Sequence, residues 1–384
     1  MDFELTEAQE MLRQGAREFA QGEFNAEYAR KCDEEHIFPR ELVKKAAEHG
    51  FVGPIFPEEY GGQGLGSLDF ALICEEFCKA DSTLATPILS SGFGTEQIHL
   101  FGSEEQKRKY MPKITAGEWI SCGAYTEPEA GSDAAGIRTT AERQGDEFVI
   151  NGTKTFITNA SVANFGAISC ITDKNAPRYR NMSIILVDDL QDRKDVQITD
   201  LGRKMGINSS LTGEMAFTDC RVPVSNIIGK EGNGFMQAMT FFDVTRIMVA
   251  AESLGIAQGA YDRALAYVRE RKQFGQPIGA FQATQFKIAE MATKIEAARN
   301  LVYKAAWFID RGHPDVVLSA MGKWFAARIA VEVCDEAIQL HGGYGYMCDF
   351  DVERFYRDAK IQEIYEGTKE IEKHTIARAI IGKL

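Results

Sequence analysis

The sequence is short of basic residues and contains no long apolar run. Its 384 residues include 43 lysines and arginines against 56 aspartates and glutamates, so the formal net charge is -13 and the pI is near 5.1. Nucleic acids and anionic membranes attract basic surfaces, and this shortage therefore argues against binding to either. No apolar segment reaches membrane-spanning length, and residues 1–6 have neither a basic region nor an apolar core. We expect a cytoplasmic protein without membrane insertion.

Cysteine pairs with C-x-x-C spacing are also missing. Among the eight cysteines, Cys74 and Cys78 are about one helical turn apart, so we expect them to pack as thiols on one helix face. Internal repeats and low-complexity tracts are absent too. With 45% hydrophobic residues, the chain is long enough for two or three folded units with substantial cores. We expect no metal site.

Helical patterns dominate the first part of the sequence. Thr6 and Gln9 match a capping box, and apolar residues then recur at helical spacing. Further helical patterns cover residues 40–49 and 67–79, with a Pro- and Gly-containing loop at 57–62 between them. The sequence therefore predicts a helical domain at residues 1–120.

The pattern changes to short strands after Cys122. Residues 148–158 predict a hairpin whose tight turn is Asn151-Gly152. Further strand patterns lie at 184–187, 196–198 and 215–217. A small β-domain is thus predicted at residues 121–230.

Long helical patterns return after residue 233, at 241–272, 282–311 and 319–340, and predict a four-helix bundle at 231–384. The predicted fold class is α+β, with helices, then strands, then helices.

Four separated motifs carry polar groups and glycines. Glu366 stands beside Gly367, and therefore close to backbone, in the segment Tyr-Glu-Gly-Thr at 365–368, and it is the candidate base. Residues 125–133 form a turn-rich segment with hydroxyls and backbone N–H groups suited to a polar ring or a phosphate. The other two motifs are Glu-Arg-Lys-Gln-Phe-Gly at 270–275 and Gln-Leu-His-Gly-Gly-Tyr-Gly at 339–345. In this order and approximate spacing, the chain resembles the acyl-CoA dehydrogenase family over essentially its whole length.

The resemblance implies an FAD-dependent enzyme that desaturates an acyl-CoA thioester between its α and β carbons. Glu366 would remove the α-proton while a hydride leaves the β-carbon for flavin N5, and the electrons would pass to an electron-transfer flavoprotein. The Glu366 backbone N–H and a ribityl hydroxyl of FAD would stabilise the charge that develops on the thioester oxygen. A homotetramer, a dimer of dimers, is implied as well, because Arg271 in this family reaches the FAD of a neighbouring subunit.

The same resemblance assigns further residues to the site. Cofactor contacts are expected from Thr126, Phe156, Thr158, Arg271, Phe274, Gln282, Gln339, Gly342, Gly343, Thr368 and Glu370. Substrate contacts are expected from Ser132, Asp243, Arg246 and Gly367, and acyl specificity from Leu84, Thr86, Leu89, Ser90 and Ser91. Phe156 departs from a common tryptophan, and Glu370 departs from a frequent amide.

The acyl group itself is constrained by another absence. No lysine or arginine occurs between Ala80 and Gln106, and Leu84 stands near where glutaryl-specific relatives carry arginine. A second carboxylate on the substrate would lack a buried cation, so a monocarboxylic acyl group is favoured, and a branched or cyclic one is compatible. Thr245 stands where some relatives place the catalytic glutamate, which leaves this role to Glu366.

Each motif also has a purely structural interpretation. Glu366 is then a solvated side chain before a helix that starts near Thr368, and Arg271 is a solvated charge. Asp243 and Arg246 form an intrahelical ion pair, and residues 342–345 are a helix C-cap and turn. Three functional alternatives also stay open: an enoyl-CoA reductase that runs the reaction in reverse, an oxidase, and an assembly protein that keeps FAD as a structural group. An intact Glu366 and the acidic charge argue against the last.

Overall fold

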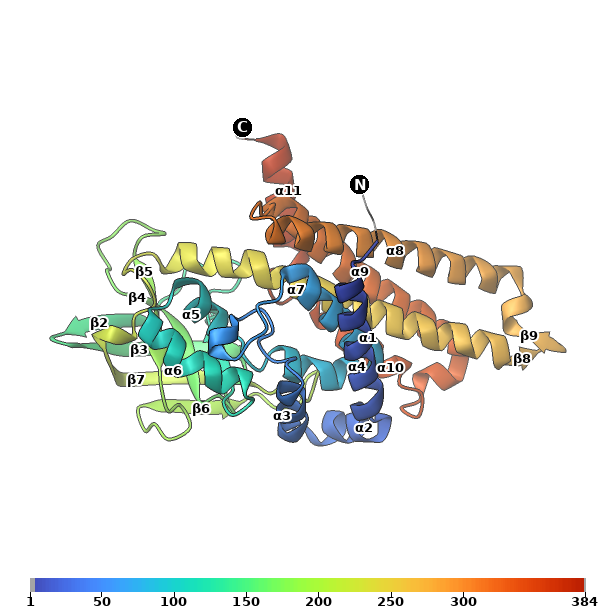
Figure 1. Cartoon of the computed structure of the whole chain (residues 1–384), viewed down its shortest axis with the longest axis horizontal. Coiled ribbons are helices and arrows are strands. Elements are labelled where there is room, and N and C mark those ends of the chain that lie inside the picture. The colour runs from blue at the N-terminus through green and yellow to red at the C-terminus, as the bar shows by residue number, and fades with distance from the viewer. Residues whose placement is uncertain (1–3, 383–384) are drawn as a thin grey trace.

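The computed structural model describes residues 4–382, and it confirms the predicted α+β class. Helices precede and follow a sheet, which lies at the left of Figure 1, while the long C-terminal helices extend to the right. The helices before the sheet are α1 Glu7–Glu23, α2 Ala26–Glu35, α3 Arg40–Glu48, α4 Ser67–Leu89, α5 Thr95–Phe101 and α6 Glu104–Thr115. The strands of the sheet are β1 Ser121–Ala124, β2 Thr140–Gln144, β3 Glu147–Thr158, β4 Phe165–Ile171, β5 Met182–Val187, β6 Val196–Asp200 and β7 Thr212–Pro223. The later elements are α7 Gly234–Glu270, β8 Lys272–Gln273, β9 Gln276–Pro277, α8 Gln282–Asp310, α9 Val316–His341, α10 Val352–Ile361 and α11 Lys369–Ile381.

Local sequence signals explain how the first helices begin and where one of them bends. The predicted capping box is present, because Thr6 Oγ1 accepts a hydrogen bond from Gln9 N at 3.3 Å and the Gln9 side chain accepts one from Thr6 N at 3.1 Å. Helix α4 runs well past the predicted end at residue 79 and contains a kink at Asp81, where φ is -165° and ψ is 110°. Cys74 and Cys78 are buried on this helix as free thiols.

The sheet corrects one prediction. Its strand order is β1-β4-β2-β3-β7-β6, with β5 paired to β4. Asn151-Gly152 is not a hairpin turn: both residues lie inside the continuous strand β3, at a register shift against β7. A Cβ at Gly152, where φ is 147°, would lie 2.6 Å from Thr139 Cα, so this glycine permits a bulge and a close backbone approach. The hairpin turn instead contains Gly145, between β2 and β3.

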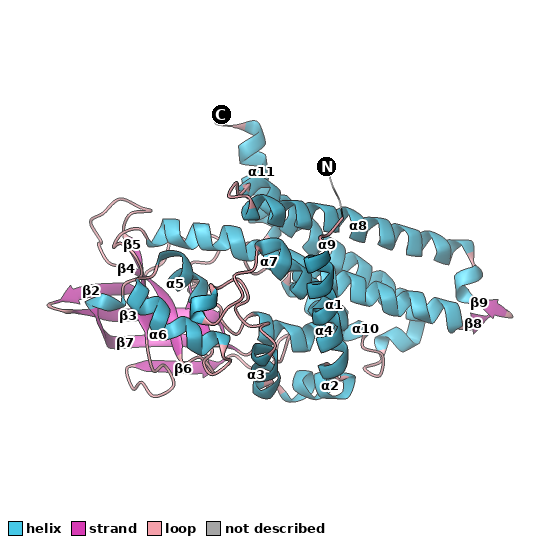
Figure 2. Cartoon of the chain, viewed as in Figure 1, coloured by secondary structure: helices cyan, strands magenta, loops and turns pink. Residues whose placement is uncertain are grey.

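The long helices α7, α8 and α9 lie side by side and form the C-terminal bundle (Figure 2). Helices α10 and α11 pack on α9, and α4 packs against α7. A Cβ at Gly255 of α7 would lie 2.4 Å from Glu75 O, and one at Gly259 would lie 2.3 Å from Lys79 O, so these glycines let α7 approach α4 closely. None of the helices within residues 4–382 combines the length and the apolar character needed to cross a bilayer.

A buried ionic network holds the α4 kink. Arg354 of α10 donates to both carboxylate oxygens of Asp81 at 2.8 Å and to Thr83 Oγ1 at 2.9 Å. Asp358, which is fully buried, accepts hydrogen bonds from the hydroxyls of Ser82 and Thr83, both at 2.8 Å. Its second oxygen accepts from the backbone N–H of Ile207 at 2.6 Å, so the network joins α4 and α10 to the segment before β7.

Candidate active site

Glu366 lies in the turn between α10 and α11. Its φ is 54° and that of Gly367 is 102°, so two consecutive residues adopt left-handed backbone conformations. Such a conformation is uncommon for a non-glycine residue and costs on the order of 1–3 kcal/mol, which surrounding contacts must offset. Thr368 caps α11, since its Oγ1 accepts from Ile371 N at 3.3 Å. The predicted helix start near Thr368 is therefore present.

The Glu366 carboxylate is held inside the protein rather than solvated. The residue is half-buried, and its Oε2 accepts a hydrogen bond from Thr245 Oγ1 of α7 at 2.8 Å. Burial raises the pKa of the Glu366 carboxyl to about 7, although the Thr245 hydrogen bond and the charges of Arg246 and Lys323 act in the opposite direction. A carboxylate with a pKa near neutrality is suited to proton transfer at that pH.

Charged side chains from α7, α9 and α11 surround this turn. Arg246 Nη1 donates to Asp243 Oδ1 at 3.1 Å, so the intrahelical ion pair considered above exists. Its Nε also lies 3.1 Å from Oε1 of Glu372, a fully buried residue of α11, although this pair lacks the alignment of a hydrogen bond. Burial raises the pKa of Glu372 to about 7, with Arg246 and Lys323 acting against that shift. Glu366 thus lies in the field of two cations, Arg246 and Lys323, and of further carboxylates.

We expect activity to fall in acid with an apparent pKa of about 7 for the free enzyme. The family resemblance makes Glu366 the expected base, and only its ionised carboxylate can accept a proton, so below this pKa the second-order rate constant for flavin reduction should drop about tenfold per pH unit. Anaerobic stopped-flow measurements at low acyl-CoA concentration from pH 5.5 to 8.5 would test this. A rate constant that stays level down to pH 5.5 would contradict it, provided the thioester still binds there.

The turn-rich segment at 125–133 is fixed by a buried ion pair. Lys154 of β3 is fully buried and donates to Glu127 Oε1 at 2.7 Å. The same carboxylate accepts from the backbone N–H groups of Arg138 at 2.6 Å and Thr139 at 3.0 Å. The carbonyl of Thr126 accepts from Thr155 N at 2.9 Å, which ties the segment to the end of β3.

This tie brings several predicted cofactor residues to one region. Thr126 and Thr158 are half-buried. Phe156 has a φ of 57° and its side chain is 69% exposed, so its ring is available to cover a flat ligand. Ser132, the predicted substrate contact, is exposed at the other end of the segment.

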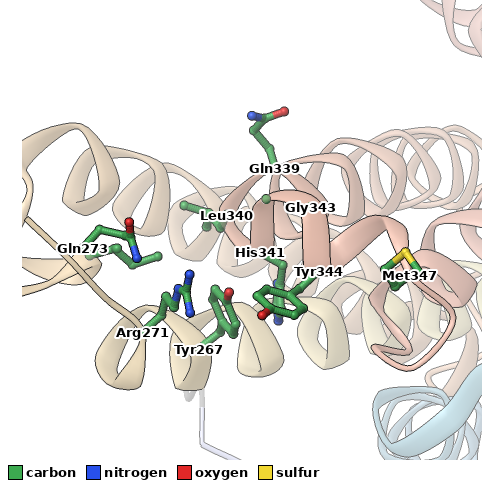
Figure 3. Close-up of a pocket in the computed structure, with 11 residues that line it drawn as sticks. Tyr267, Arg271, Gln273, Gln339, Leu340, His341, Gly343, Tyr344 and Met347 are labelled. Atoms are coloured by element: carbon green, nitrogen blue, oxygen red, sulfur yellow. The ribbon is translucent and has the colours of Figure 1, made fainter.

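A groove of about 440 Å³ lies at the ends of α7 and α9 (Figure 3). Its lining includes the predicted residues Arg271, Gln339, Gly342 and Gly343. Figure 3 shows Arg271, Tyr267, His341 and Tyr344 close together, with the Gln339 side chain pointing away from them. The remaining predicted cofactor residues lie outside this lining: Phe274 is 93% exposed beside β8, and Gln282 and Glu370 are exposed on α8 and α11.

The groove fits a diphosphate. Arg271 is exposed and pairs with no carboxylate within residues 4–382; its guanidinium instead lies 5.5 Å from the Tyr344 ring centroid. A Cβ at Gly342 or Gly343 would meet no atom within 4 Å, so the backbone there is open to a ligand. Gly342, at φ 61°, is also the C-cap of α9, so the cap and an open backbone coexist. A free guanidinium beside open backbone suits an anionic phosphate.

The residues predicted to set acyl specificity are mostly closed off. Leu84, Thr86 and Ser91 are buried, and Leu89 and Ser90 are half-buried. The hydroxyls of Thr86, Ser90 and Ser91 donate to carbonyls of Ser82, Thr86 and Ile88 at 2.9, 2.7 and 2.8 Å. These hydroxyls are therefore used within their own segment.

The sequence did not identify two groups that lie near Glu366, a carboxylate and a cluster of aromatic rings. Glu96, in the first turn of α5, accepts from Gly94 N at 2.9 Å, and burial raises its pKa to about 7, with a further increase from the charge of Glu366. An aromatic wall, which we define as Phe93, Tyr125, Phe241 and Phe242, has neighbouring ring centroids 5.1 to 5.6 Å apart. In the sequence, only the Phe-Phe pair before Asp243 pointed to the aromatic wall. Glu96 could have been noticed as a carboxylate in a segment without lysine or arginine. Within the described residues, no group of three or more His, Cys, Asp or Glu side chains could hold a metal ion.

Comparisons with known proteins cover the whole molecule. The models of the N-terminal, middle and C-terminal domains of acyl-CoA dehydrogenase match residues 6–118, 122–220 and 232–381. The chain is 45% identical to an acryloyl-CoA reductase (NADH) of Anaerotignum propionicum, covering 100% of this chain and 97% of the relative. It is 44% identical to a short-chain-specific acyl-CoA dehydrogenase of Clostridium acetobutylicum, covering 99% and 100%.

A solved structure agrees with these matches. A chain from a study of the electron transferring flavoprotein of Acidaminococcus fermentans superposes with a TM-score of 0.95 at 43% identity, over 100% of both chains. Three family models in the expected order, relatives above 40% identity and a structural match over the full length agree with the motifs and with a groove whose lining suits a diphosphate. The chain therefore belongs to the acyl-CoA dehydrogenase family and is an FAD-dependent oxidoreductase.

Proposed function

We propose that Glu366 is the base that removes the α-proton of a monocarboxylic acyl-CoA, and that the electrons pass to an electron-transfer flavoprotein. The observation that carries this proposal is the carboxylate of Glu366, held by Thr245 at 2.8 Å with a pKa raised to about 7. The likeness to a chain from a study of an electron transferring flavoprotein supports that class of partner.

The backbone at Glu366 supports a second role for the same residue. Its N–H finds no acceptor within residues 4–382 and is free to donate to a thioester oxygen. A donor aimed at this oxygen stabilises the negative charge that develops as the α-proton leaves, because no reorganisation of water is required. Asp243 and Arg246 lie next to Thr245 on α7 and would contact the polar arm of the substrate, together with Ser132 and Gly367.

FAD when bound supplies the hydride acceptor for the β-carbon, which no protein side chain provides. Thr126, Phe156 and Thr158 would hold the flavin ring, and Thr368 and Glu370 would approach it from the start of α11. Arg271, Gln339, Gly342 and Gly343 would hold the diphosphate of a neighbouring subunit, with Phe274 and Gln282 nearby. The exposed Phe274 supports burial in an assembly, and we propose a homotetramer with domain boundaries near residues 120 and 230.

The acyl group is proposed to be apolar. The aromatic wall supports this assignment, since its side chains carry no positive charge that could compensate a second carboxylate. The named function of the Anaerotignum relative favours a second candidate, an enoyl-CoA reductase that uses the same residues in reverse. A non-catalytic assembly protein would not need a base with a pKa near 7.

Anaerobic titration of the purified holoprotein tests the proposal. Butyryl-, isobutyryl-, octanoyl- and cyclohexanecarbonyl-CoA should be added separately while flavin absorbance is followed. Bleaching by at least one thioester, with formation of its enoyl-CoA, is the expected result. The proposal would be contradicted if the protein retained FAD and no thioester of the panel bleached it. The reductase would be favoured if crotonyl-CoA oxidised the dithionite-reduced enzyme while no saturated thioester reduced the oxidised enzyme.

A further inference from the structure

Lys323 is a buried lysine near the catalytic turn that the proposed chemistry does not use. It lies on α9 with its side chain fully buried. Burial lowers the pKa of Lys323, and the nearby carboxylates of Glu372 and Glu366 counteract that effect. A buried ammonium is unfavourable unless hydrogen bonds and opposite charges compensate it, so its contacts indicate why the position carries a lysine.

These contacts are the two carbonyls on either side of Glu366. Lys323 Nζ donates to the Tyr365 carbonyl oxygen at 2.9 Å and also to the Gly367 carbonyl oxygen. No other donor within residues 4–382 reaches either oxygen. The Lys323 ammonium therefore hydrogen-bonds to both ends of the turn in which Glu366 and Gly367 have positive φ.

The peptide unit between Tyr365 and Glu366 links this contact to the thioester site. A trans peptide is planar, and its C=O and N–H point in opposite directions. The described residues contain no cis peptide bond, so fixing the Tyr365 carbonyl also fixes the direction of the Glu366 N–H. A positively charged ammonium that hydrogen-bonds to the carbonyl oxygen polarises the amide and makes its N–H a stronger donor.

We propose that Lys323 is a positioning residue that orients and polarises the Tyr365–Glu366 peptide so that the Glu366 N–H stabilises the thioester oxygen. This inference rests on the proposed function, because the oxygen belongs to the substrate of that reaction. Within the described residues, the Lys323 ammonium donates hydrogen bonds only to these two backbone carbonyls, and it acts through them.

Three variants of the holoprotein separate this role from a contribution to folding. Lys323→Met keeps an unbranched apolar stem but removes the donor and the charge, and Arg246 remains beside Glu372. Lys323→Arg keeps both the donor and the charge. Lys360→Met is the matched control, since it removes a partly exposed lysine that pairs with Glu363 on the same C-terminal segment.

Three measurements test the variants. Hydrogen exchange of residues 362–372 in the absence of thioester reports on the turn. The infrared stretch of ¹³C-carbonyl-labelled crotonyl-CoA reports on polarisation of the bound thioester. Anaerobic flavin reduction by the most active thioester of the panel reports on the reaction.

In Lys323→Met we expect faster exchange, a carbonyl stretch that returns toward its value in solution, and reduction slowed about 10²- to 10³-fold, the effect of losing one donor to an oxyanion. Lys323→Arg should recover part of all three, and Lys360→Met should match the wild type. Slower reduction with an unchanged carbonyl stretch would reduce Lys323 to a structural residue and overturn the proposal.

Failure of the proposed function gives a different result. In that case no thioester reduces the wild-type flavin. The exchange and infrared measurements still decide the role of Lys323, because neither requires turnover. Unchanged exchange in Lys323→Met would then overturn the inference.

Discussion

Glu366→Gln should slow flavin reduction by acyl-CoA about 10²- to 10⁴-fold, the range that a positioned base contributes. Glutamine has the same shape, and its amide oxygen can still accept the hydrogen bond from Thr245 that the carboxylate accepts now. It cannot take up a proton at neutral pH. The measurement is single-turnover reduction at saturating thioester, with the FAD content of each preparation determined from its absorbance.

The matched control is Glu48→Gln, which changes an exposed glutamate at the end of α3 and should reduce at the wild-type rate. Crotonyl-CoA should bind to Glu366→Gln with nearly wild-type affinity, because the backbone N–H remains. Reduction of Glu366→Gln at the wild-type rate would move the role of base to another group, and Glu96 and Glu252, whose pKa values burial also raises, would be tested next.

Arg354→Met should lower the free energy of unfolding by about 3–5 kcal/mol, the usual effect of removing one partner from a buried ion pair. Both side chains of the Arg354–Asp81 pair are 4% exposed, and Asp358 lies in the same network. Without the guanidinium, two carboxylates remain inside the protein with no full counter-charge. Urea-induced unfolding of FAD-saturated protein, followed by circular dichroism, would measure the change.

Arg328→Met is the control for this variant. Arg328 pairs with Glu332 on the surface of α9 and is 49% exposed, so its loss should change stability by only about 0–1 kcal/mol. A double variant, Asp81→Asn with Arg354→Met, should be less destabilised than the sum of its single variants. Equal midpoints for Arg354→Met and Arg328→Met would show that the buried pair contributes no more than a surface pair.

The sequence predicted those features that depend on neighbouring residues. The Thr6 capping box and the start of α11 at Thr368 depend on residues close in sequence. The grouping of Gly342 and Gly343 with Arg271, which lie far apart in the chain, followed from the family resemblance alone. Asn151-Gly152 shows the limit of such signals, because the same dipeptide suits a tight turn and a bulge, and only the close approach of Thr139 decides between them.

Long-range partners account for what was missed. The kink at Asp81 is held by Arg354, 273 residues later in the chain, so residues close to Asp81 in sequence could not predict the kink. Lys323 is buried because α7, α8 and α11 pack around α9, and the sequence alone does not show this packing. The placement of Thr86, Ser90 and Ser91 near the acyl group stays a prediction, and the structure adds that their hydroxyls donate to carbonyls three or four residues earlier in the chain.

The late position of Glu366 in the chain has a consequence for biosynthesis. A ribosome completes α4, the sheet and α7 long before it adds the turn that carries this glutamate. Until that turn leaves the exit tunnel, Lys323 lacks both of its carbonyl partners and Thr245 lacks its carboxylate partner. Under the proposed function, a chain whose turn is still inside the tunnel therefore cannot act on thioesters, and premature termination at the end of α10 yields a polypeptide with nearly all of its core but without the proposed base.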